Sequence, residues 1–169
     1  MHDKGNINRS ASPVSGISPR SVRRVAMDCL ARREHSFFEL KKKLQLKFPD
    51  KSIVEIQQEL EKLRDENLQS DKRFVESYVR YRKSRGFGYL HIRNELRSKY
   101  VADVLIDQLL FVDDSDWLEI INNLVAKRAR QSQQLTSGSK DYFKIIRYLE
   151  QRGFPLNLTE KVLAKHLSH

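Results

Sequence analysis

Residues Asp71 to Val101 read DKRFVESYVRYRKSRGFGYLHIRNELRSKYV, and this stretch gives the clearest indication of the fold class. Its apolar side chains recur at helical spacing on both sides of two glycines, Gly86 and Gly88. No strand-like pattern precedes the glycines and no Lys-Ser or Lys-Thr pair follows them, which argues against a phosphate-binding loop. The pattern therefore predicts two amphipathic helices joined by a turn that needs unusual backbone angles. Their apolar positions are Phe74, Val75, Tyr78 and Val79 before the turn and Tyr89, Ile92 and Leu96 after it.

This apolar pattern is found three times along the chain. At one constant offset, Leu90, Ile92, Leu96 and Tyr100 follow Phe38, Leu40, Leu44 and Phe48. A third copy consists of Phe143, Ile145 and Leu149, with Phe154 one position late. A unit of about 45 residues buries little surface alone, so neighbouring units must share a core. We therefore predict an all-α protein made of three tandem three-helix repeats, similar to helix-turn-helix units, in an elongated, curved array.

Turn and capping patterns divide the chain further. The first residues are rich in Gly, Pro, Ser and Asn, which predicts a flexible leader at 1–19, followed by repeats at 20–68, 69–112 and 113–169. Capping boxes are predicted at Ser36 with Glu39, Ser52 with Glu55, and Asn157 with Glu160, and Asp114 or Ser115 can cap a further helix. The expected helices are 20–33, 36–48, 51–66, 71–85, 88–99, 101–111, 114–129, 139–152 and 156–167.

Charge is unevenly distributed in this chain of 169 residues, whose formal net charge is +10. Basic residues dominate 71–100 and 126–169, whereas 101–125 contains acids and no Lys or Arg. Basic zones of this kind suit nucleic acid, an anionic membrane or an acidic protein surface, and charge alone does not choose among them.

Several classes of function find no support in the sequence. Cys29, the single cysteine, lies among apolar positions, which favours a reduced core residue and a cytoplasmic protein. No stretch has the length and hydropathy of a signal peptide or a membrane span. His166 and His169 share a helix face but have no further clustered ligands. We expect no catalytic residues, no cofactor and no metal, because no nucleophile, base and orienting partner occur together.

The central stretch resembles that of the RecX family of regulatory proteins. The resemblance is carried by Arg73 and Phe74, by the turn Arg85, Gly86, Phe87 and Gly88, and by Ile92, Arg93, Glu95 and Leu96. LARREHSFFELKKKL at 30–44 resembles the family's first unit, and Arg147, Tyr148, Leu149, Arg152, Gly153 and Phe154 resemble the end of its third. Two departures stand out, namely Tyr89 in place of a usual Pro and Tyr100 where a Gly is common.

The resemblance implies a partner and an activity. A RecX protein lodges in the helical groove of a RecA–DNA filament and modulates, mostly by inhibition, RecA ATPase, strand exchange and coprotease activity in recombination and the SOS response. We therefore expect contacts with RecA and with single- and double-stranded DNA, directly or through RecA, by a monomer that binds no membrane. Arginine suits such contacts because its guanidinium forms forked hydrogen bonds to carboxylates and phosphates. The candidate contact residues are Arg73, Arg80, Arg82, Arg85, Arg93, Arg97 and Lys99.

Two other functions remain open at this stage. A stand-alone nucleic-acid-binding protein can present a basic helix to a duplex, and it would bind naked DNA in a strongly salt-dependent way. A structural adaptor would use the helical array to hold an unrelated acidic protein.

Overall fold

The computed structural model describes residues 21–130 and 135–167, and these residues form nine α-helices, one short 3-10 helix and no strand. The predicted all-α class is thereby confirmed, and the helices begin and end within four residues of the predicted ranges. The leader predicted at 1–19 lies outside the described residues. The helices are α1 (Val22–Leu30), α2 (Phe37–Lys47), α3 (Ile53–Asp65), α4 (Asp71–Ser84), α5 (Tyr89–Ser98), α6 (Asp103–Leu109), α7 (Asp116–Ala129), α8 (Lys140–Gln151), α9 (Leu156–Leu163) and the 3-10 helix η1 (Ala164–His166).

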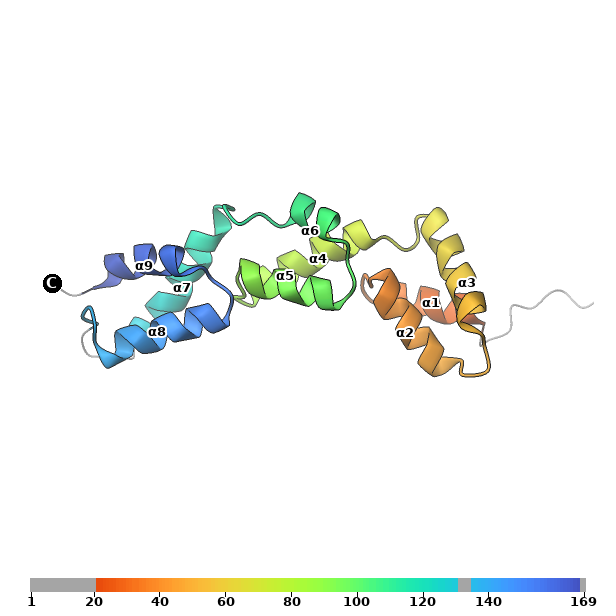
Figure 1. The fold of residues 1–169 in the computed structure, drawn as a ribbon, viewed down its shortest axis with the longest axis horizontal. Helices are drawn as coiled ribbons and strands as arrows, with labels where there is room; N and C mark the ends of the chain where they lie inside the picture. The colour runs from red at the N-terminus through yellow and green to blue at the C-terminus, as the bar shows by residue number, and fades with distance from the viewer. Residues whose placement is uncertain (1–20, 131–134, 168–169) are drawn as a thin grey trace, which may run out of the picture.

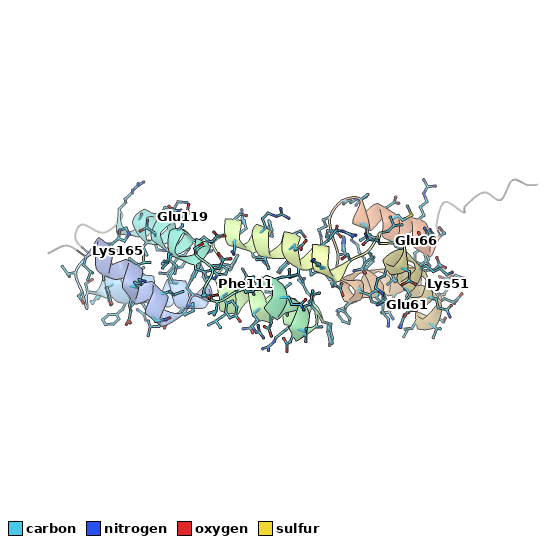
Figure 2. All side chains as sticks on the ribbon, turned by 90° about the horizontal axis from the view of Figure 1, so that it is seen from above. Lys51, Glu61, Glu66, Phe111, Glu119 and Lys165 are labelled. Carbon is cyan, nitrogen blue, oxygen red and sulfur yellow. The ribbon has the colours of Figure 1, made fainter. Side chains whose placement is uncertain are left out.

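The helices lie in three groups of three along one long axis (Figure 1). Group 1 contains α1 to α3, group 2 contains α4 to α6, and group 3 contains α7 to α9 with η1. Seen from above, the same row is long and narrow, and side chains project from it along its whole length (Figure 2). The domain boundaries predicted after residues 19, 68 and 112 stay a prediction.

The buried apolar side chains form two separate hydrophobic clusters. Group 1 has its own cluster, which includes Ala26, Cys29 and Leu60. Groups 2 and 3 share a second cluster, which runs from Phe74 in α4 to Leu163 in α9. The helical spacing predicts part of these cores correctly, because two apolar positions of each copy are buried. They are Leu40 and Leu44 in α2, Ile92 and Leu96 in α5, and Ile145 and Leu149 in α8. Three other positions of the pattern, Leu90, Tyr100 and Phe143, are exposed.

Four helices end in the same kind of turn. In each, the residue after the C-cap has a positive φ, and the next backbone N–H returns to a carbonyl five positions earlier, which is the Schellman arrangement. The residues with positive φ are Asn67 (58°) after α3, Gly86 (74°) after α4, Tyr100 (57°) after α5 and Gly153 (84°) after α8. Tyr100 is the exception among them, because glycine and, less often, asparagine adopt this conformation, whereas a residue such as tyrosine costs about 1–2 kcal/mol there unless other contacts offset it.

Groups 2 and 3 meet where the turn after α4 touches the turn after α8. The Gly88 N–H donates to the carbonyl of Arg152 at 2.7 Å, and the Leu90 N–H donates to that of Gly153 at 3.0 Å. A Cβ on Gly88 would lie 2.6 Å from the Gly153 oxygen, and one on Gly153 would overlap the backbone of His91. Two glycines therefore allow the two backbones to approach within hydrogen-bonding distance.

The side chain of Arg152 completes this contact. Its guanidinium donates to the carbonyls of Arg85 and Gly86, both at 2.9 Å, which are free at the end of α4. It also lies 4.9 Å from the ring centroid of Phe87 and 4.8 Å from that of Tyr148. One side chain of group 3 thus caps a helix of group 2.

The predicted caps are found in part. Ser52 and Glu55 form a complete capping box, and the Asp114 carboxylate accepts the Asp116 N–H at 3.0 Å. Ser36 caps α2 through the Glu39 N–H. The box predicted at Asn157 and Glu160 is wrong, because α9 begins at Leu156 directly after Pro155, so that Asn157 lies inside the first turn. The proline ring fixes φ at −61° and favours a helix start there.

Replacing Gly153 by Ala should separate groups 2 and 3. We expect the free energy of unfolding to fall by more than about 2 kcal/mol, because the new methyl group overlaps backbone atoms and φ is positive. Chemical denaturation followed by circular dichroism measures this loss.

Gly138→Ala is the matched control, since Gly138 also has a positive φ, of 74°, but no atom of the described residues lies within 4 Å of a Cβ there. It should cost only about 1 kcal/mol from the backbone alone. Equal losses in the two variants would contradict the close approach of the turns.

Candidate partner-binding surface

Five of the seven predicted contact residues already have ionic partners inside the molecule. Arg73, Arg82, Arg93, Arg97 and Lys99 each pair with an acidic side chain. Arg80 and Arg85 are exposed, and no hydrogen bond or ion pair of their side chains is present in the described part of the chain. The seven residues therefore fall into two groups, five with an internal acidic partner and two without one among the described residues.

The acids of α6 cover the basic face of α5. Arg97 holds both carboxylate oxygens of Asp103, at 2.7 and 3.2 Å, and Arg93 is hydrogen-bonded to Asp107 and to the Tyr89 hydroxyl. The hydrogen bond from Arg97 lowers the pKa of Asp103 below its ordinary value. The acidic zone of the sequence thus neutralises part of the basic zone that precedes it.

Arg82 belongs to the interior of group 2. Its guanidinium donates to the Tyr78 hydroxyl at 3.1 Å and to the Glu95 carboxylate, and it lies 4.9 Å from the centroid of Phe87. Because a partly buried charge with three such contacts is costly to remove, we expect Arg82 to stabilise the fold.

Arg73 and Lys99 join group 2 to group 1. Arg73 pairs with Glu34 at 2.7 Å, and Lys99 pairs with Glu39 at 2.5 Å. Around them the junction is polar, since the Phe37 N–H donates to the Asp71 carboxylate at 2.8 Å. Groups 1 and 2 are thus held by charges and hydrogen bonds, in contrast to the shared apolar core of groups 2 and 3.

His35 lies buried at the centre of this polar junction. It is 3% exposed, its Nδ1 lies 3.0 Å from the Arg33 carbonyl, and its Nε2 has no hydrogen-bond partner among the described residues. A carbonyl can only accept, so Nδ1 carries a proton and donates it. Burial lowers the pKa of His35 below its ordinary value.

Two of the grooves where the groups meet are lined by three or more basic side chains. The first, of about 370 Å³, lies between α2 and the end of α5, and its basic lining consists of Arg33, Lys42, Lys43 and Lys99. The second, of about 440 Å³, lies between α4 and α7, and its basic lining consists of Lys83, Arg85 and Lys127. Lys83 is paired with Asp114 and Asp116, so Arg85 and Lys127 supply the free charge of the second groove.

Sequence reasoning missed the lysines of α2. Lys42, Lys43 and Lys47 are exposed, and the described residues offer their side chains neither a hydrogen bond nor an ion pair. The run LKKKLQLK at 40–47 is the signal that could have identified them, because its lysines lie between and after the buried Leu40 and Leu44.

No group of three or more His, Cys, Asp or Glu residues suited to a metal ion occurs within 21–130 and 135–167. His166 instead lies 2.7 Å from the Asn122 side chain, and His169 lies outside the described residues. None of the described helices is long and apolar enough to cross a membrane.

Comparison with known proteins gives a consistent result. A family model described as RecX, second three-helix domain, matches residues 70–110. The regulatory protein RecX of Pseudomonas putida is 34% identical over 147 residues, which cover 87% of this chain and 92% of the relative. That of Mannheimia succiniciproducens is 42% identical over 135 residues, which cover 76% and 83%. The crystal structure of RecX from Lactobacillus salivarius shares the fold, with a TM-score of 0.73, 24% identity and coverage of 86% and 94%.

Acid should weaken the fold through His35. Because its pKa is lowered in the folded state, stability is fully present above the unfolded value of about 6.5 and is lost as the pH falls below it. The free energy of unfolding should decrease by at most about 1.4 kcal/mol per pH unit from this group. Denaturation series between about pH 7.5 and pH 5 measure the slope.

His35→Asn should flatten this slope, because it removes the group whose pKa is lowered by burial. An unaltered slope in the His35 variant would show that another group causes the acid sensitivity.

Proposed function

Since the chain belongs to the RecX family of regulatory proteins, we propose that it binds the RecA–DNA filament and modulates RecA. The proposed effect is mostly inhibitory and extends to RecA ATPase, strand exchange and coprotease activity in recombination and the SOS response. We further propose that it acts without a catalytic step of its own, as a cytoplasmic monomer.

The observation that carries this proposal is the long row of helical groups. Each group has basic side chains without an ionic partner among the described residues. Group 1 offers Lys42 and Lys43, group 2 offers Arg80 and Arg85, and group 3 offers Lys127. A helical filament repeats the same protein surface around a polyanion, so an elongated binder with spaced charges can contact several adjacent subunits.

The geometry also narrows the set of candidate contacts. We propose Arg80 and Arg85 as direct contacts, because their side chains are exposed and have no internal partner among the described residues. Arg73, Arg82, Arg93, Arg97 and Lys99 stay candidates from the sequence, but contact with RecA or DNA would require them to leave or share an acidic partner.

A second candidate function is nucleic-acid binding without RecA. The basic groove between groups 1 and 2 favours it, since it combines lysines with an aromatic side chain, Phe38. A pull-down on RecA-coated and on bare DNA separates the two functions, and an adaptor for an unrelated acidic protein would be retained on neither.

The regulatory proposal predicts a loss of DNA-dependent ATP hydrolysis when this protein is titrated into RecA filaments from the same organism. Steady-state phosphate release measures the effect, with filament formation confirmed by light scattering. Unchanged hydrolysis at saturating protein, with filaments present, would contradict the proposal.

The double variant Arg80→Gln/Arg85→Gln should need about 2- to 10-fold more protein for the same effect, because each exposed charge contributes up to about 1 kcal/mol. Lys161→Gln/Lys165→Gln is the matched control, since it removes the same charge from the exposed surface of α9 and η1. Equal shifts in the two double variants would assign the effect to net charge rather than to α4.

A further inference from the structure

Tyr100 occupies a position that its side chain does not favour. It follows α5 with a φ of 57°, its N–H donates to the Arg97 carbonyl at 2.9 Å, and the Val101 N–H donates to that of Leu96 at 3.2 Å. Glycine is the usual residue at this point of a Schellman turn, and tyrosine adds strain there. A strained side chain that is nevertheless present points to a use for that side chain.

The ring of Tyr100 is both anchored and accessible. Its centroid lies 3.9 Å from that of Phe38 in α2, with 31° between the planes. The residue is nevertheless 72% exposed, so Phe38 covers one face of the ring and solvent reaches the other. The pair therefore presents a flat, preoriented aromatic surface at the junction of groups 1 and 2.

This aromatic pair borders the basic groove of about 370 Å³, which Phe38 itself lines. The groove contains the cations Arg33, Lys42, Lys43 and Lys99, and one carboxylate, Glu39, which is held by Lys99 at 2.5 Å and by Arg33 at 3.3 Å. These four cations outnumber the single carboxylate, and Lys42 and Lys43 have no partner among the described residues. The groove is thus suited to an anion of more than one charge.

From this arrangement we infer that the groove binds single-stranded nucleic acid, with an unpaired base stacked on the Tyr100 ring and phosphates held by Lys42 and Lys43. An aromatic surface beside a row of cations is how proteins bind single strands, because every base has a flat face and every linkage a charge. A duplex keeps its bases stacked on each other and cannot offer that face. The inference rests on the second candidate function, nucleic-acid binding without RecA, and deepens it by naming the single strand as the ligand and Tyr100 as the residue that contacts a base.

The experiment uses the full chain with a labelled oligothymidylate of about 20 nucleotides and a duplex of the same length, at low salt, by fluorescence anisotropy. Tyr100→Gly should keep the fold, with an unchanged or higher denaturation midpoint, because glycine adopts the positive φ without strain. Its affinity for the single strand should fall by about 5- to 100-fold, with its affinity for the duplex constant within about 2-fold.

Lys42→Gln/Lys43→Gln should lower the slope of log affinity against log salt by about 1.4, as expected for two phosphate contacts. Phe143→Ala is the aromatic control, since Phe143 is 51% exposed in group 3, and it should leave single-strand affinity unchanged within about 2-fold.

Four results would overturn the inference. They are no binding of the single strand at low salt, an unaltered affinity in Tyr100→Gly, an equal loss in Phe143→Ala, and displacement of the strand by polyglutamate as readily as by unlabelled oligonucleotide. Because RecA ATP hydrolysis is measured separately, any of these can occur while the regulatory proposal holds, and the reverse is equally distinguishable.

Discussion

The close approach of two backbones at Gly88 and Gly153 is the constraint on which the rest of the architecture depends. Hydrogen bonds of 2.7 and 3.0 Å between the turns require that neither glycine has a side chain. Once the turns are in contact, Arg152 reaches the end of α4, and Trp117 packs with Phe154 at a centroid distance of 6.3 Å. The shared core of groups 2 and 3 follows from this one contact.

Group 1 is joined to the remainder by a different kind of interaction. Its apolar cluster is separate, and its contacts with group 2 are ion pairs, hydrogen bonds and one aromatic pair. Polar contacts at partly exposed positions contribute less than apolar burial and depend on salt and pH. The chain is therefore expected to behave as two cooperative units of unequal size, the larger of which contains groups 2 and 3.

Much of the fold could be predicted from the sequence, because the spacing of apolar residues along a helix indicates which face of the helix is buried. Leu40, Ile92 and Ile145 were placed in the core from that spacing alone. Ion pairs between side chains of different helices produce no comparable pattern in the sequence. Arg93 and Asp107 are 14 residues apart, and whether they meet depends on the angle between α5 and α6. The ionic partners of the candidate contact residues could therefore not be predicted from the sequence, since a basic residue in the sequence does not reveal whether an acid covers it.

The end of α5 is linked to the position of group 1, because Tyr100 belongs to group 2 and Phe38 to group 1. If group 1 swung away, Phe38 would leave with it, and the strain at Tyr100 would lose the contact that offsets it. The last turn of α5 would then relax, and the relaxed turn would no longer fit the returning ring. The contact between the two rings therefore links the position of group 1 to the conformation at the end of α5, so that a change in one would be expected to affect the other.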